Sequence, residues 1–310
     1  MRPFALPIAA AALLGAPAAL AEEWPSGPLT MKIGFEAGGS TDIQGRVLAN
    51  VFEEHFGVPV NVVNEPGAAS AVALTSLKNT EDDGHTFLYG PQIGLTFSPI
   101  VSDVEYDIDD FRYPALVALG QNAIVTSAEQ PFSTMEELLD YGQDNPLTYA
   151  QQSPIDQQII ETVAGEAGLD LAIVPTGGGG GMAPLVLGEE VDFAFSGGTH
   201  AQYTPTGEME ILAFLGTERS PFYPDVPTLI EEGFDLAMED YRALVLPGDV
   251  SDEVVARFEE AARVATEHEE FRSTVEDDTF LPVEFFGTAD SEEMVRDIRA
   301  GNEDLMAGAD

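Results

Sequence analysis

Cysteine is absent from the 310-residue sequence, and basic residues are scarce. The lack of cysteine excludes disulfide scaffolds, thiolate zinc sites, iron–sulfur clusters and cysteine nucleophiles. Only 12 Lys and Arg oppose 55 Asp and Glu, a net charge of −43, so the chain would repel the phosphates of nucleic acids and anionic membranes. We therefore expect no nucleic-acid partner. Disorder is the usual alternative for so charged a chain, but 44% of the residues are hydrophobic and 18 are Phe, which argues against it.

Long hydrophobic runs are lacking as well. The first 21 residues, MRPFALPIAAAALLGAPAALA, contain one Arg, a short apolar run and small residues ending Ala19-Leu20-Ala21. Signal peptidases accept such an ending, and the apolar run is too short to span a bilayer, so we predict a cleaved signal peptide over residues 1–21. The alternative is a buried N-terminal helix. No later stretch is apolar enough to span a membrane, so we expect an exported, soluble mature protein without direct membrane insertion.

The acidity allows two interpretations. Lys32 and Lys78 are the only lysines, and the other cations are Arg. Repulsion among carboxylates is screened at high salt, where the Debye length falls to about 3 Å at 1 M. Adaptation to a saline medium is the hypothesis that we favour, and a merely acidic surface is the alternative.

Patterns typical of strands and helices alternate from Trp24 onward, which predicts an α/β fold with largely parallel sheets. The length fits roughly two domains. No linker-like stretch divides the chain, so the two domains are not expected to follow one another as separate units.

The clearest binding signal is the loop Gly38-Gly39-Ser40-Thr41-Asp42, between a predicted strand at 29–35 and a predicted helix. Glycines let the backbone approach a ligand, and the free N–H groups of the first helical turn carry a partial positive charge that attracts carboxylate or phosphate. The alternative is that Asp42 or Thr41 merely caps the helix. A dinucleotide fingerprint and a P-loop lysine are both absent, so we expect no nucleotide and no other cofactor.

Two further loops have small residues after a strand. Glu65 to Ser70 leaves room for a ligand beside the first loop, and the five glycines Gly177 to Gly181 form either a third binding loop or a flexible solvent loop. Catalytic and metal sites are not expected, because the four His are scattered and no H-E-x-x-H or G-x-S-x-G pattern occurs. Ser196 and His200 share a loop, so an exported hydrolase remains the least favoured alternative.

Seven motifs occur in an order and spacing that resemble the periplasmic solute-binding receptors of tripartite tricarboxylate transporters, also called Bug proteins. The resemblance covers essentially the whole mature chain. The motifs are Trp24-Pro25-Ser26, Gly34 to Asp42, Asn64 to Ala68, Asp83 to Leu88, Val174-Pro175, Gly188 to Asp192, and Ser220-Pro221 with Pro224 to Thr228.

The resemblance implies a two-lobed periplasmic-binding-protein fold of type II-like character, with mostly parallel or mixed sheets flanked by helices and a ligand cleft between the lobes. The first lobe would comprise residues 22–121 and 244–310, and the second residues 122–243. The ligand would be a small di- or tricarboxylate or related organic acid. We expect the protein to act as a monomer in the periplasm and to deliver the ligand to the membrane subunits of a tripartite tricarboxylate transporter. A periplasmic sensor module for a signalling receptor is the alternative.

The resemblance also implies which residues contact the ligand. From the first lobe come the Gly38 loop, the small-residue loop and the strand end Gly90-Pro91-Gln92, and from the second lobe a polar loop at Gln152. The expected set is Phe35, Gly38, Gly39, Ser40, Thr41, Asp42, Ala69, Ser70, Gly90, Gln92, Gln152, Ser153, Asp156, Thr176, Gly178, Ser196, Thr199, Tyr241 and Arg242.

The chain departs from its relatives at several of these positions. Ala37 stands where a Pro is usual before the double glycine, and Thr176-Gly177 replace a Tyr-Lys pair. Arg242 follows Tyr241 where an aromatic pair is usual. The Arg242 guanidinium could bind a second carboxylate of the ligand in bidentate fashion, or it could pair with Glu239 or Asp240 at the surface.

Overall fold

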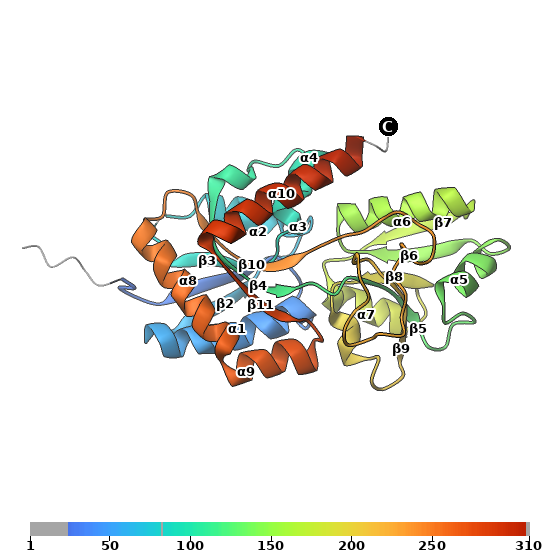
Figure 1. Ribbon diagram of the computed structural model, residues 1–310, viewed down its shortest axis with the longest axis horizontal. Helices are drawn as coiled ribbons and strands as arrows, with labels where there is room; N and C mark the ends of the chain where they lie inside the picture. Colours follow the sequence, from blue (N-terminus) through green and yellow to red (C-terminus); the bar gives the residue numbers. More distant parts are fainter. Residues whose placement is uncertain (1–23, 82, 308–310) are drawn as a thin grey trace, which may run out of the picture.

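The computed structural model describes residues 24–81 and 83–307. The predicted signal peptide lies outside the described residues. Two separate sheets, of six and five strands, lie side by side along the long axis of the molecule (Figure 1). The predicted α/β organisation in two lobes is therefore present. We call residues 24–119 and 241–307 lobe 1, and residues 123–240 lobe 2; the boundaries expected from the sequence remain predictions.

The sheet of lobe 1 has the order β11-β4-β10-β3-β1-β2. Strand β1 is parallel to β2 and β3, whereas β10 runs antiparallel to β3 and β4. Helices α1 and α8 cover one face, and α2 and α10 cover the other (Figure 1). The strands are β1 Leu29–Ile33, β2 Val60–Asn64, β3 Thr86–Pro91, β4 Phe111–Leu119, β10 Tyr241–Pro247 and β11 Val283–Gly287; the helical segments are α1 Ser40–Phe56, α2 Ala71–Lys78, α3 Ile93–Thr96, α4 Ser98–Val101, η1 Ile108–Asp110, α8 Asp252–Glu267, α9 Glu269–Arg272, η3 Ser273–Asp278 and α10 Thr288–Ala307.

The sheet of lobe 2 has the order β7-β6-β8-β5-β9, with β6 parallel to β7 and β8. Helices α5 and α6 pack on one face and α7 on the other. The elements are β5 Ala123–Ser127, α5 Met135–Gly142, β6 Leu147–Gln151, α6 Pro154–Ala167, β7 Leu171–Pro175, α7 Gly179–Leu187, β8 Phe193–Ser196, η2 Thr199–Gln202 and β9 Met209–Phe214.

Helix α1 shows how the sequence pattern becomes structure. Leu48, Val51 and Phe52 recur at helical spacing and are buried, and Gly57 ends the helix with φ 71°, a left-handed conformation that favours glycine. Phe52 packs against Phe258 of α8, with ring centroids 6.1 Å apart. This packing fixes the axis of α1, and therefore the direction in which its first turn points.

The chain crosses between the lobes twice. Residues 120–122 connect β4 to β5, and the segment before β10 returns to lobe 1. The two crossings are hydrogen bonded to each other, because Gly120 N donates to the carbonyl oxygen of Asp240 at 2.6 Å. An added Cβ at Gly120 would lie 2.8 Å from that oxygen, so the glycine permits this close approach.

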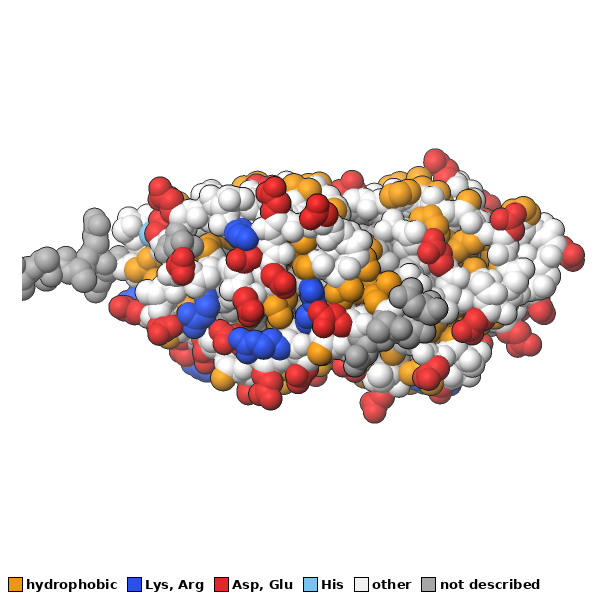
Figure 2. Space-filling model, turned by 90° about the horizontal axis from the view of Figure 1, so that it is seen from above, with side chains coloured by type: hydrophobic (Ala, Val, Ile, Leu, Met, Phe, Trp, Pro, Cys, Tyr) orange, Lys and Arg blue, Asp and Glu red, His pale blue; other side chains and the backbone are white. Residues whose placement is uncertain are grey.

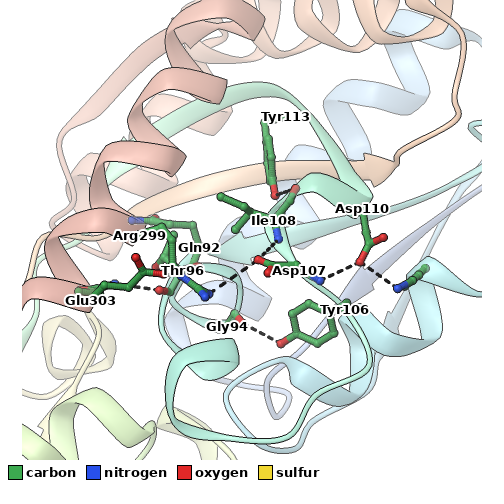
Figure 3. Close-up of polar contacts among 12 residues, drawn as sticks. Gln92, Gly94, Thr96, Tyr106, Asp107, Ile108, Asp110, Tyr113, Arg299 and Glu303 are labelled. Atoms are coloured by element: carbon green, nitrogen blue, oxygen red, sulfur yellow. Dashed lines mark hydrogen bonds and ion pairs between the residues drawn. The ribbon is translucent and has the colours of Figure 1, made fainter. Parts of the chain in front are cut away.

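The short helix α3 is held in place by the segments around it (Figure 3). Tyr106 Oη donates to the Gly94 carbonyl oxygen at 2.7 Å, and Asn302 of α10 donates to the Thr96 carbonyl oxygen at 3.3 Å. Arg299 of α10 lies 3.9 Å from Asp107. These contacts fix α3 at the end of lobe 1 that faces lobe 2.

Basic residues are divided unequally between the lobes. Lobe 2 has 21 acidic residues and Arg219 as its one Lys or Arg, while lobe 1 holds ten of the described Lys and Arg. Acidic side chains occur over both halves of the surface in Figure 2, and most of the visible basic ones lie on the lobe 1 side. Nine of the ten lobe 1 cations form ion pairs within 4.0 Å, the exception being Arg257.

Candidate ligand-binding cleft

A cavity of about 460 Å³, counting the part open to solvent, lies between the two lobes. Its lining comes from four places: the loop before α1, the end of β3, the two crossings, and the loops of lobe 2 that face them. The lining residues are Phe35, Gly39, Ser40, Thr41, Pro91, Ile93, Asn122, Gln152, Ser153, Gly179, Phe195, Gly197, Thr199, Met238, Asp240 and Arg242.

The first turn of α1 faces lobe 2 without a side-chain cap. Gly39 is the N-cap residue and makes no capping hydrogen bond, and Ser40 N donates to Thr199 Oγ1 across the cleft at 3.3 Å. The structure therefore contradicts the alternative considered from the sequence, in which Asp42 or Thr41 caps the helix. Gly39, Ser40 and Thr41 of this terminus line the cavity, where the partial positive charge of the helix N-terminus favours an anion.

Asp42 instead stabilises the Gly38 loop through its side chain, which lies outside the cavity lining. Its buried carboxylate accepts hydrogen bonds from Gly38 N, Asn64 Nδ2 and Arg46 Nε, each at 3.0 Å. Burial alone would raise the pKa of Asp42, but the hydrogen bonds from Arg46, Gly38 and Asn64 outweigh it and lower the pKa below its ordinary value. Asp42 therefore stays ionised and stiffens the loop.

The polar loop of lobe 2 is built around Asp156. Asp156 Oδ1 accepts from Ser153 N and Ser153 Oγ, while Oδ2 accepts from Gln152 N, so the carboxylate joins the loop to the first turn of α6. Burial raises the pKa of Asp156 to about 6, although these hydrogen bonds act in the opposite direction. Gln152 and Ser153 line the cavity, and Asp156 positions them.

The glycine run forms the entry to α7 and packs against the Gly38 loop, rather than forming a solvent loop. Glu36 N donates to the Gly177 carbonyl oxygen at 3.1 Å, which joins the lobes through backbone. A Cβ at Gly180 would clash with the Ala37 carbonyl oxygen, and one at Gly181 would clash with the Glu36 carboxylate. The absence of side chains therefore allows the lobes to approach this closely.

Arg242 is the cation of the cleft, and it is only 1% exposed. Its Nη1 lies 2.8 Å from Asp240 Oδ2, Nη2 donates to the Gly197 carbonyl oxygen at 2.6 Å, and Nε donates to Gln44 Oε1 at 3.3 Å. The pairing with Asp240 that the sequence suggested is present, but it is buried rather than at the surface. Burial raises the pKa of Asp240 to about 6 even with Arg242 beside it.

The structure places the expected ligand-contacting residues in two groups. Those lining the cavity are Phe35, Gly39, Ser40, Thr41, Gln152, Ser153, Thr199 and Arg242, and those outside the lining are Gly38, Asp42, Ala69, Ser70, Gly90, Gln92, Asp156, Thr176, Gly178, Ser196 and Tyr241. Most of the second group adjoin lining residues, but Ser70 packs against Gly34 and Gly94 instead. Lining residues that sequence reasoning missed are Ile93, Asn122, Phe195, Gly197, Met238 and Asp240, whereas Pro91 and Gly179 lie in loops that it had indicated. The expected lobe boundary at residues 121 and 122 was the one signal that could have indicated Asn122.

Ser196 and His200 do meet, but in the interior of lobe 2. Ser196 Oγ and His200 Nδ1 are 3.0 Å apart, and both residues are 0% exposed. Burial lowers the pKa of His200 to about 3. Neither residue lines the cavity, so no substrate in the cleft reaches this pair. Within residues 24–81 and 83–307 no cluster of three or more His, Cys, Asp or Glu is arranged to hold a metal ion, and no helix is long and apolar enough to cross a bilayer.

Two α/β lobes joined by two crossings, with a cavity between them, are the architecture of periplasmic binding proteins, and comparison with solved structures confirms the fold. The periplasmic binding protein BugD is similar with a TM-score of 0.86 at 21% identity, covering 92% of this chain and 98% of BugD. MatC from Rhodopseudomonas palustris, solved with bound malate, has a TM-score of 0.82 at 20% identity, covering 91% of this chain and 99% of MatC.

Sequence comparison assigns the chain to one family. Residues 45–301 match the family described as "Tripartite tricarboxylate transporter family receptor", and the chain belongs to that family. A UPF0065 protein from the gbd 5′ region of Cupriavidus necator is 30% identical over 275 residues, covering 86% of this chain and 83% of that protein. The predicted resemblance is confirmed, and the family is one of solute receptors, not of enzymes.

Proposed function

We propose that this protein captures a small organic acid, of the di- or tricarboxylate class, by closing its lobes over it. The observation that carries the proposal is the uncapped first turn of α1, which faces lobe 2 across the cavity. Main-chain N–H groups at Gly39 and Thr41 would bind one carboxylate of the ligand, and Ser40 N would exchange its hydrogen bond to Thr199 Oγ1 for one to the same carboxylate. The malate bound to MatC supports this class of ligand.

Arg242 is proposed to provide the positive potential for the rest of the anion. Three of its nitrogens already bond to Asp240, Gly197 and Gln44, so it would act mainly through its charge and through N–H groups that remain. The other residues of the expected set that lie outside the lining would position the loops.

Delivery to the membrane subunits of a tripartite tricarboxylate transporter is the proposed next step, with the closed form as the state that those subunits recognise. We propose that the mature protein begins near Glu22, acts as a monomer and resides in the periplasm. N-terminal sequencing of the exported protein and its mass in solution test these points.

The ligand proposal is tested with the mature protein, residues 22–310, in 2 M NaCl. Its thermal unfolding midpoint is measured with a panel of mono-, di- and tricarboxylates, each matched with its uncharged amide, and hits are titrated by calorimetry. At least one carboxylate should raise the midpoint and bind 1:1, while its amide should not. Binding of the amides alone, or of no acid in the panel, would contradict the proposal.

A further inference from the structure

Asn122 is a buried amide whose polar atoms have no partner in the protein. It lies on the first crossing between the lobes, lines the cavity and is 2% exposed. Its backbone is fixed, because its carbonyl oxygen accepts from Leu215 N at 2.8 Å. Neither Oδ1 nor Nδ2 of its side chain forms a hydrogen bond with any group in residues 24–81 and 83–307. Buried polar atoms are almost always paired in folded proteins, so this side chain calls for an explanation.

The neighbouring polar side chains of the cavity are already bonded within the protein. Gln152 Nε2 donates to the Phe195 carbonyl oxygen at 2.7 Å, Ser153 Oγ donates to Asp156 at 2.8 Å, and Ser40 Oγ donates to the Gly197 carbonyl oxygen at 2.9 Å. Asn122 differs from these three residues because neither polar atom of its side chain forms a hydrogen bond among the described residues.

Glycine at position 197 leaves space beside the amide. A Cβ built on Gly197 would lie 3.6 Å from Asn122 Oδ1 and 3.9 Å from Arg242 Nη2, so no side chain from this position occupies the space between the amide and the guanidinium. Asp240 also lines the cavity, and its Oδ1 has no hydrogen-bond partner among the described residues. Among the side chains of the lining residues, the buried atoms without a partner in the described part of the chain are thus two acceptor oxygens, Asn122 Oδ1 and Asp240 Oδ1, and one donor, Asn122 Nδ2.

An unsubstituted carboxylic acid cannot satisfy this set. Ionised carboxylates only accept hydrogen bonds, so they can pair with Asn122 Nδ2 but not with either acceptor oxygen. A ligand that also has a hydroxyl or ammonium group supplies the missing donor. Sites built to bond such a group reject analogues that lack it, because the buried protein groups are then left unpaired.

We infer that Asn122 is a specificity-determining residue, which selects acids that have a hydrogen-bond donor on the carbon chain over the same acids without it. The inference rests on the proposed carboxylate-binding function and names its ligand class more narrowly. A hydroxy acid and an amino acid share the required chemistry.

The experiment compares ligands that differ at one carbon. Succinate, malate and aspartate have hydrogen, hydroxyl and ammonium at that carbon, and tricarballylate and citrate form the same pair among tricarboxylates. Calorimetric Kd values for wild-type protein should favour a substituted acid over its unsubstituted partner by at least about tenfold. The malate and aspartate arms then show which donor is preferred.

Asn122→Leu removes both polar atoms with little change in shape. The preference for the substituted acid should fall to within about twofold, while the unfolding midpoint of the ligand-free protein should be unchanged or higher, since unpaired buried groups are removed. Asn145→Leu is the matched control, because Asn145 Nδ2 donates to the Tyr141 carbonyl oxygen away from the cavity. That variant should lower the midpoint and keep the preference. Asn122→Ala tests the same preference if the Leu variant folds poorly.

Outcomes separate this inference from the proposed function. If wild-type protein binds no acid of the set, the proposed function fails. If it binds succinate as tightly as malate and aspartate, and tricarballylate as tightly as citrate, only the role of Asn122 fails. A preference that survives in the folded Asn122 variants would likewise overturn it.

Discussion

Arg242 Nη2 in lobe 1 donates a hydrogen bond of 2.6 Å to the carbonyl oxygen of Gly197 in lobe 2. The same oxygen accepts from Ser40 Oγ at 2.9 Å. One backbone carbonyl of lobe 2 is therefore hydrogen bonded to both helix α1 and strand β10 of lobe 1. The contact between the lobes is therefore linked to the buried ion pair of Arg242 with Asp240.

Arg242→Met should destabilise the protein by about 3–5 kcal/mol, because it leaves the Asp240 charge buried without its partner. Asp240→Asn in the same chain removes that charge, and the double variant should regain more than half of the loss. Equilibrium urea unfolding of the ligand-free protein measures both. A double variant as unstable as Arg242→Met would show that packing of the Arg side chain, rather than the uncompensated charge, is what matters.

Gly180→Ala should weaken ligand binding by about tenfold or more, since a methyl group there clashes with the Ala37 carbonyl oxygen only when the lobes are together. Small-angle scattering of the ligand-free variant should show a larger radius of gyration than wild type. Gly165→Ala in α6 is the matched control, because its Cβ would meet nothing within 4 Å. It should leave affinity unchanged and add about 1 kcal/mol of stability. Equal effects of the two substitutions on affinity would contradict this role of the glycine run.

Asp156 should make the protein more stable on mild acidification. Burial raises its pKa to about 6, above the ordinary 3.8, so its contribution is fully present below about pH 4 and is lost as the pH rises through 6. Relative to Asp156→Asn, which cannot titrate, wild-type stability should fall by about 3 kcal/mol between pH 4 and pH 8. Urea unfolding of both proteins across this range isolates the effect, since the other carboxylates are common to the pair. If the stability difference between wild type and Asp156→Asn is flat or rises with pH, burial does not raise the pKa of Asp156.

Much of the fold could be predicted from the sequence because local patterns determine it. The strand, glycine loop and amphipathic helix from Leu29 to Phe56 occur where periodicity and loop composition place them. The loop at Gln152 was expected from the family resemblance alone, although Ser153 and Asp156 have the spacing of the capping box that the structure shows.

What the sequence could not show depends on how the two lobes meet. Glycines at 177–181 are compatible with a solvent loop until Glu36 and Ala37 are placed against them. The role proposed for Asn122 rests on the lack of a hydrogen-bond partner for its amide among the described residues, and the neighbouring Gly197 is 75 positions away in the chain. Burial of the Arg242–Asp240 pair similarly requires both crossings to be assembled.

Salt should stabilise lobe 2 more than lobe 1. Lobe 2 has only Arg219 to offset its 21 acidic residues, so its carboxylates repel one another until salt screens them. In lobe 1 most cations are paired with acids at the surface, and salt weakens such pairs while it screens the remaining repulsion. Hydrogen exchange of the intact protein from 0.2 M to 2 M NaCl should therefore show a larger gain in amide protection in residues 123–240.

Sucrose, an excluded solute without charge, serves as the control and should protect both lobes alike. If NaCl gives no gain in amide protection, adaptation to a saline medium is contradicted. If the gain is equal in both lobes, the uneven distribution of cations does not determine the response to salt.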